Sequence, residues 1–301
     1  MSPDVADQSS ADFDVRRWVV ILLRGVGQVM FQGHAATGLL FVVGMAVAGP
    51  LMAIGALLGA IVGPATAHVL RFDRGELADG IYGFNSTLVG VGLIFYLKPE
   101  PFTWGLIVLG GVIATVLTFG LRRLVKAPTY TTPFIVTTWI ALVIAHAAAG
   151  TSIDVKPAPP SATPAGFVAA VLDGAAEVMF GANVATGALF LVGIALSNWR
   201  HAAIATLGSI AGTALAMYHN DPSGSISIGI YGYNAALAAM AVYLWRPSLL
   251  LPILGAIISV PMTEFFPKSV GLPALTAPFV VASWIVLALG SLEGRFERMP
   301  A

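Results

Sequence analysis

Two stretches of this chain repeat almost residue for residue. Residues 28–44 read QVMFQGHAATGLLFVVG, and residues 177–193, which begin 149 positions later, read EVMFGANVATGALFLVG. At the same separation, GIYGFN at 80–85 is matched by GIYGYN at 229–234. An internal repeat constrains the fold more than any local pattern, because both copies are expected to adopt the same structure.

A third pair of motifs completes the repeat. PTYTTPF at 128–134 is matched by PALTAPF at 273–279, 145 positions later. Three motif pairs in the same order predict two homologous halves, which we place at residues 1–150 and 167–301. The Pro-rich stretch between them, residues 151–166, is interpreted as a linker.

The composition predicts a membrane protein. The chain is 57% hydrophobic and only 10% charged, whereas soluble domains carry about 25% charged residues. The net charge is zero, so nucleic acid is not an expected partner, and there is no cysteine. The polar, acidic N-terminus does not resemble a signal peptide. GxxxG-like spacings in the apolar segments are typical of close helix packing.

Each half divides into six apolar stretches. They lie at about 18–31, 33–50, 51–70, 80–97, 102–121 and 132–149, and at about 167–180, 182–198, 202–219, 228–245, 248–265 and 277–293. A membrane-spanning helix needs about 17–20 residues. The first stretch of each half has 14 residues, which is about 21 Å as a helix. We therefore predict two re-entrant half-helices and ten spans, five in each half.

The distribution of basic residues tests this prediction. With five spans per half, one side of the membrane holds eleven basic residues and the other holds three, against eight and six if the short segments also crossed. The larger group is Arg16, Arg17, Arg71, Arg74, Arg122, Arg123, Lys126, Arg200, Arg246, Arg295 and Arg298, and the smaller is Lys98, Lys156 and Lys268. Both termini are then cytoplasmic and the linker is external. An odd number of spans inverts the second half, and such inverted repeats place permeation sites near the midplane.

The ends of the two half-helices are the first candidate site. A helix C-terminus leaves carbonyl oxygens unpaired, and these oxygens accept hydrogen bonds from N–H donors. Glu177 lies at one such end and Gln28 at the other. A carboxylate at membrane depth costs about 2.5–3.5 kcal/mol, so it normally marks a pathway. The alternative for Glu177 is a structural pair with Arg24 or a cap on nearby backbone N–H groups.

Other polar residues also occur in pairs. Thr131 and Thr276 each precede a proline by two residues, and the alternative to a pore role is local hydroxyl-to-carbonyl bonding. Asn85 and Asn234 follow Gly-rich turns and are expected to cap or tether a broken helix.

The remaining charged and histidine positions are weaker candidates. Arg24 and Asp173 are equivalent in the repeat and are expected to brace the half-helices. His34 is opposite Asn183, so facing pore histidines are not predicted.

Taken together, the QVMF and EVMF segments, the GIYGFNSTLVG and GIYGYNAALAA stretches at 80–90 and 229–239, and the Thr-x-Pro-Phe segments resemble the urea transporter family along essentially the whole chain. The resemblance implies a bacterial member in the cell inner membrane, a homotrimer among lipid in which each subunit has its own pore. Such proteins conduct urea down its gradient without a cofactor or ion coupling.

The resemblance also implies which residues form the selectivity filter. An outer site would be framed by Gln28, Val29, Phe31, Phe84 and Leu88. An inner site would be framed by Glu177, Val178, Phe180, Tyr233 and Leu237. Thr131 and Thr276 would flank the middle, and Tyr233 departs from the phenylalanine expected there. Urea is flat, neutral and rich in N–H donors, which suits stacked oxygens between apolar faces.

Two alternatives stay open. An ion-coupled secondary transporter can share inverted repeats and broken helices, and Glu177 would then supply the coupling site. A channel of the same family could instead conduct another small neutral solute, such as a short amide, ammonia or water. No catalytic, metal or phosphate-binding motif supports an enzyme.

Overall fold

The computed structural model describes residues 14–149, 164–267 and 271–296, and these residues form helices without any strand. The predicted all-α fold is confirmed for this part of the chain. Most of the expected linker at 151–166, together with Lys156, Lys268 and Arg298, lies outside the described residues.

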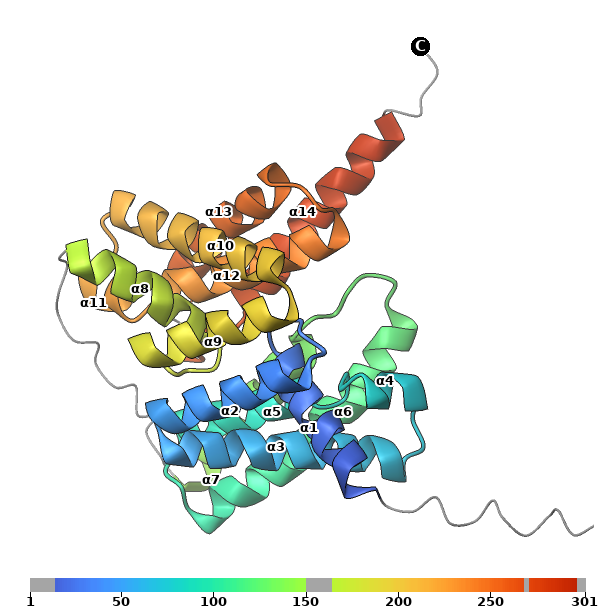
Figure 1. Cartoon of the computed structure of the whole chain (residues 1–301). Coiled ribbons are helices and arrows are strands. Elements are labelled where there is room, and N and C mark those ends of the chain that lie inside the picture. Colours follow the sequence, from blue (N-terminus) through green and yellow to red (C-terminus); the bar gives the residue numbers. More distant parts are fainter. Residues whose placement is uncertain (1–13, 150–163, 268–270, 297–301) are drawn as a thin grey trace, which may run out of the picture.

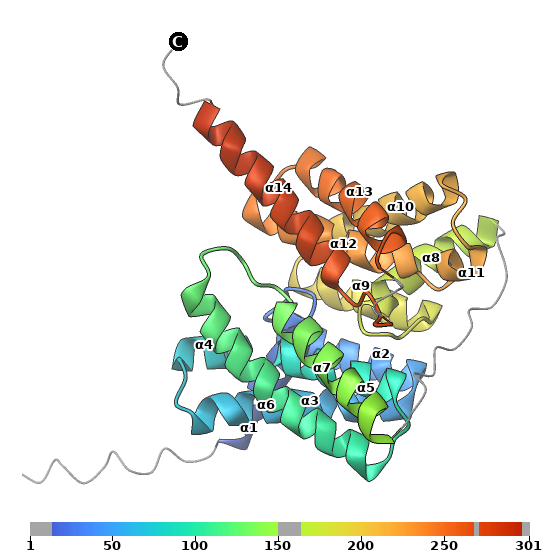
Figure 2. The ribbon, with the colours of Figure 1, turned by 180° about the vertical axis from the view of Figure 1, so that it is seen from behind.

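Seven described helices come from each half (Figures 1 and 2). The first half contains α1 (Val15–Gln28), α2 (Ala35–Ala48), α3 (Pro50–Val69), α4 (Arg74–Ala78), α5 (Phe84–Tyr96), α6 (Pro101–Leu124) and α7 (Thr132–Ala149). The second contains α8 (Pro164–Glu177), α9 (Val184–Ser197), α10 (Trp199–Tyr218), α11 (Ser223–Ser227), α12 (Ile230–Trp245), α13 (Leu250–Glu264) and α14 (Ala277–Phe296). The short helices α4 and α11 were not predicted, because five residues are too few to give a periodic pattern.

The two predicted half-helices end at the expected residues, α1 at Gln28 and α8 at Glu177, although the apolar stretches continue beyond them to 31 and 180. The chain then turns, and Phe31 and Phe180 have positive φ values of 61° and 58°. A positive φ is incompatible with a continuing right-handed helix. Hydropathy alone does not reveal such a turn, since the turning residues are themselves apolar.

The sequence analysis distinguished half-helices from spans by length, but the helix lengths in the structure do not make this distinction. The helices α2 and α9 each have 14 residues, the same length as α1 and α8. They end where Gly49 and Asn198 adopt extended backbone. By length and composition, α3, α6 and α10 are the three described helices able to cross a membrane. The arrangement of ten spans stays a prediction.

The apolar side chains are distributed as in a membrane protein. The helices α5 and α12 are buried along most of their length and form the centre. Surrounding helices expose large apolar side chains, such as Leu39 and Val47 on α2 and Leu109 on α6. A soluble monomer rarely exposes contiguous apolar surface on this scale. The exposed apolar faces therefore fit a lipid environment.

The two halves meet through reciprocal contacts between α2 and α9, which lie side by side in Figure 1. The Thr37 hydroxyl donates to the Gly193 carbonyl at 2.6 Å, and the equivalent Thr186 hydroxyl donates to Gly44 at 2.9 Å. The rings of Phe41 and Phe190 lie 4.4 Å apart. Reciprocal contacts of this kind are those that two copies make across a two-fold axis.

A second reciprocal pair joins the halves. The indole N–H of Trp139 donates to the Pro273 carbonyl at 2.8 Å, and that of Trp284 donates to Pro128 at 2.7 Å. Each tryptophan thus holds the turn that precedes the other's helix. The inverted orientation of the halves in a membrane stays a prediction.

Glycines allow α3 to lie directly against α5. A Cβ atom added to Gly59 would lie 2.0 Å from the Ser86 carbonyl oxygen, and one added to Gly90 would lie 2.0 Å from that of Gly55. The close packing expected from the GxxxG spacing is confirmed here, because no side chain fits between these backbones.

Candidate functional site

The ends of α1 and α8 have the same geometry. The Phe31 N–H donates to the Gln28 carbonyl at 3.0 Å, and the Phe180 N–H donates to Glu177 at 3.0 Å. Among the described residues, no donor hydrogen-bonds to the carbonyls of Val29 or Val178, the next residue in each turn. These oxygens remain available to an N–H donor, as the sequence predicted for the two helix ends.

Glu177 and Gln28 also fasten the turns in which they lie. Glu177 is 6% exposed, and its carboxylate accepts a hydrogen bond from the backbone N–H of Ala182. The Gln28 amide donates to the Asp79 carbonyl at 3.0 Å. The capping alternative for Glu177 is thus confirmed. It does not exclude a pathway role, because a carboxylate has about four lone-pair sites and this bond occupies one.

Arg24 does not pair with Glu177. Its guanidinium donates to the Ala78 carbonyl at 3.0 Å and lies 3.9 Å from the Asp79 carboxylate. Arg24 therefore ties α1 to the end of α4, which fits the expected bracing role. The equivalent Asp173 differs, because its buried Oδ1 has no hydrogen-bond partner among the described residues. The bracing expected of Asp173 is not found there.

Thr131 and Thr276 meet at the contact between the halves. Their hydroxyl oxygens lie 2.7 Å apart, and the two residues are 3% and 2% exposed. Each lies directly before a helix, α7 or α14. Local bonding of each hydroxyl to its own helix was the alternative expected from the sequence. The structure instead joins the two hydroxyls across the repeat.

Asn85 and Asn234 hold these helix starts in place. The side-chain oxygen of Asn85 accepts from the Phe134 N–H at 3.2 Å, and that of Asn234 accepts from Phe279 at 3.2 Å. Both N–H groups belong to the first turn of a helix, where no intrahelical partner exists. The predicted capping role of both asparagines is confirmed.

The hydroxyl of Tyr233 has a partner in the chain. It donates to the Leu275 carbonyl at 2.5 Å, directly before Thr276. Leu275 has a positive φ of 49°, as does the equivalent Tyr130 at 46°. The phenol in place of the expected phenylalanine thus supports this strained turn.

The phenylalanine of each turn contacts a ring of the other half. Phe31 of the first half contacts Phe279 of the second, with centroids 6.3 Å apart, and also Tyr130 at 6.0 Å. Phe180 of the second half contacts Phe134 of the first at 6.4 Å. Each turn therefore inserts its phenylalanine toward the opposite half. Phe134 and Phe279 were not predicted as site residues, although their Thr-x-Pro-Phe motif was noted.

The remaining candidates line the centre of the fold. Leu88 on α5 and Leu237 on α12 are fully buried, as are Val29 and Val178 to within 2%. Phe84 is half-buried and packs against the same core. No described ring contact joins Phe84 to Phe31.

A polar contact that the sequence analysis did not predict holds the turn after α1. The Gln32 amide donates to the Met30 carbonyl at 2.8 Å, and its oxygen lies 3.2 Å from Nδ1 of His201 on α10. The repeat gives no signal for this contact, because the positions equivalent to Gln32 and His201 are Gly181 and Met52.

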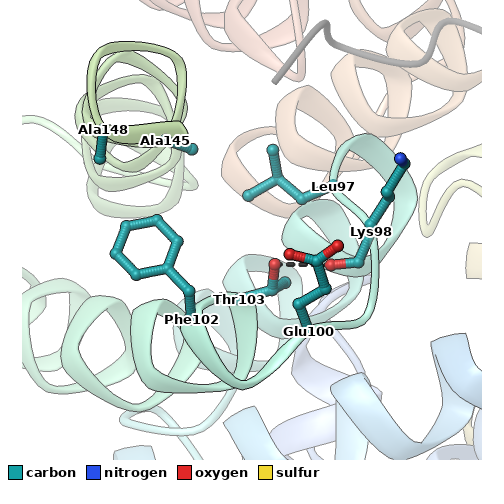
Figure 3. A pocket seen from close by; sticks show the side chains of 7 residues that line it. All are labelled: Leu97, Lys98, Glu100, Phe102, Thr103, Ala145 and Ala148. Atoms are coloured by element: carbon teal, nitrogen blue, oxygen red, sulfur yellow. Dashed lines mark hydrogen bonds between the residues drawn. The ribbon is translucent and has the colours of Figure 1, made fainter. Parts of the chain in front are cut away.

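A surface cleft lies away from these residues. It has a volume of about 130 Å³. Figure 3 shows it between the loop after α5, the start of α6 and the end of α7. The hydroxyl of Thr103 donates to the Lys98 carbonyl at its edge. None of its lining residues is a candidate site residue, so we do not assign it to the pathway.

The fold and the site define a helical membrane protein whose two halves join around a buried centre, where two backbone oxygens accept no hydrogen bond from a described residue. The chain belongs to the urea transporter family, whose model matches residues 19–291. Among similar proteins, urea transporter 1 of Ovis aries is 28% identical over 311 residues, which cover 94% of this chain and 79% of the relative. Urea transporter 1 of Rattus norvegicus is 30% identical, with 93% and 79% covered. The family is one of transporters.

Proposed function

We propose that this protein conducts urea passively across a membrane along the buried centre between its two halves. The observation that carries the proposal is the match to the urea transporter family over residues 19–291. The relatives named above are urea transporters.

The chemistry of the site supports urea as the solute. Urea offers N–H donors along its edges, and the carbonyls of Val29 and Val178 accept no hydrogen bond from a described residue. Phe31 and Phe180 lie two residues further along the same turns and supply flat apolar rings. An ion entering such a place would lose hydration without full replacement, which costs several kcal/mol.

We assign roles to the site residues on this basis. Gln28, Val29, Phe31, Phe84 and Leu88 would form an outer site, and Glu177, Val178, Phe180, Tyr233 and Leu237 an inner one. Thr131 and Thr276 would separate the two. Several weak sites in series favour fast conduction over tight binding.

The proposed arrangement in the membrane follows from the sequence. It comprises two inverted repeats, each of five spans and one half-helix, with both termini in the cytoplasm. The protein would assemble as a homotrimer with one pore per subunit. The exposed apolar faces of the outer helices suit contact with lipid or with other subunits.

Relative permeability tests the choice of solute. After the rate through empty liposomes is subtracted, proteoliposomes should take up urea faster than acetamide or ammonia, and the urea rate should not change when a protonophore is added. Preference for another small neutral solute would reassign the cargo. Abolition of urea flux by the protonophore would favour proton coupling, with Glu177 as the candidate coupling residue.

A further inference from the structure

The C-terminal end of α10, the loop after it and the end of α13 bring together His219, Asp221 and Glu264. One ligand atom from each of these three side chains lies within 4.8 Å of the others. Nδ1 of His219 and Oε1 of Glu264 are 2.7 Å apart. The cluster lies apart from the residues of the proposed pathway in sequence and shares no hydrogen bond with them.

One oxygen in this cluster lacks a partner. Oδ2 of Asp221 is inaccessible to solvent and has no hydrogen bond among the described residues. The same carboxyl group also faces Glu264 and the hydroxyl of Tyr231. Two carboxylates side by side with a buried free oxygen are unfavourable unless a cation or a shared proton lies between them.

The corresponding region of the first half, formed by the end of α3, the loop after it and α6, has no such cluster among the described residues. The positions 149 residues before His219 and Asp221 are Leu70 and Phe72, and those 149 and 145 residues before Glu264 are Thr115 and Phe119. The Phe72 ring stacks on Phe119 with centroids 3.7 Å apart, and Glu76 binds Arg122 at 2.7 Å. The turn is otherwise alike, since Arg71 and Asn220 have φ values of 56° and 59°. The fold of this region therefore does not require His219, Asp221 or Glu264.

We propose that His219, Asp221 and Glu264 form a binding site for one divalent metal ion of the zinc class. Imidazole nitrogens and carboxylate oxygens are both ligands of Zn²⁺, which in its open sites takes three protein ligands and leaves a fourth position for water. Alkaline-earth ions prefer sites made of oxygen alone. The Glu264 side chain is 9% exposed and that of His219 is 35% exposed, so an ion could enter from the histidine side. The ion would clamp the loop before α11 to the end of α13.

Zinc titration of the purified full-length protein by calorimetry at neutral pH tests the site. Wild-type protein should bind one Zn²⁺ per subunit, and Zn²⁺ should raise its melting temperature, because an ion that binds only the folded state stabilises it. His219→Ala and Glu264→Gln should each weaken binding at least about ten-fold. Mg²⁺ and Ca²⁺ should not substitute for Zn²⁺.

His146→Ala is the matched control, because His146 is an exposed histidine at the end of α7 far from this cluster in sequence. It should bind Zn²⁺ as the wild type does. Glu264→Gln keeps the shape of the side chain, and its melting temperature without metal shows whether it folds. Absence of saturable binding in the wild type would overturn the proposal. Equal binding by a folded His219→Ala/Asp221→Asn/Glu264→Gln variant would also overturn it.

Discussion

The hydroxyl oxygens of Thr131 and Thr276 lie 2.7 Å apart, although the residues are 145 positions apart in the chain. This contact joins the two halves at the place where α7 and α14 begin. Thr131 and Thr276 are equivalent positions of the two halves, and both belong to the proposed pathway.

Thr131→Val should slow urea flux while the protein still folds. Valine keeps the shape of threonine but leaves the buried Thr276 hydroxyl without its partner, which costs about 1–3 kcal/mol. The double variant with Thr276→Val should be less harmful than the sum of the single variants, because both remove the same bond. Stopped-flow urea flux and thermal melting measure the two effects. Thr66→Val is the control, since the hydroxyl of Thr66 donates to the Val62 carbonyl within α3 and not across the halves. Normal flux in a folded Thr131→Val variant would remove this residue from the pathway.

Glu177→Leu should reduce urea flux roughly ten-fold or more, because it removes a buried hydrogen-bonding group from the proposed pathway, which costs about 1–3 kcal/mol. Glu177→Gln is the matched variant. It retains an oxygen for the Ala182 N–H and places at 177 the residue found at the equivalent position 28. It should therefore keep most of the flux. If the leucine variant is folded and conducts like the wild type, Glu177 serves only as a cap.

Tyr233→Phe should lower thermal stability modestly and leave urea flux nearly unchanged. The phenol hydroxyl donates to the Leu275 carbonyl, so its loss removes one buried hydrogen bond, worth about 1 kcal/mol. The Asn234 amide remains within 3.4 Å of the same carbonyl. Melting curves and flux are compared with those of the wild type. A large loss of flux without a change in stability would place the hydroxyl in contact with the solute.

Gly59→Ala should destabilise the fold strongly. The added Cβ atom would lie 2.0 Å from the Ser86 carbonyl oxygen, so α3 and α5 would have to move apart. Gly120→Ala is the control, because nothing lies within 4 Å of a Cβ atom at that position in α6. The control should be neutral or slightly stabilising, since alanine favours helices over glycine. Recovery of monodisperse protein and its melting temperature distinguish the two variants. Similar values for both would contradict the packing described for Gly59.

The sequence predicted those features that leave a local or repeated signal. The prediction of a helix at 132–149 agrees with α7, because an apolar run follows a proline-containing start that favours the first helical turn. The capping role of Asn85 was predicted from its place after a Gly-rich turn. The ends of α1 and α8 were predicted at Gln28 and Glu177, as found, although the apolar stretches run three residues further because the turning residues are apolar.

Contacts between the halves could not be derived from the sequence. Phe31 contacts Phe279, and Phe180 contacts Phe134, so each of these rings packs against the other half. No local sequence pattern indicates which half a ring will contact. The contact between Gln32 and His201 breaks the repeat symmetry, so the repeat gave no signal for it. The repeat aligns Asp173 with Arg24, but no hydrogen bond like that of Arg24 to Ala78 is seen for Asp173 Oδ1 among the described residues.

Urea uptake into proteoliposomes that hold the purified protein, at equal pH and without an ion gradient, tests the central claim most directly. The account predicts fast uptake that stops at equal concentrations, exceeds that of empty liposomes and ignores a protonophore. In the same assay, the Glu177→Leu variant should take up urea slowly, and the Glu177→Gln variant should take it up at a rate close to that of the wild type. Absence of uptake until a proton or sodium gradient is imposed would contradict a passive pathway.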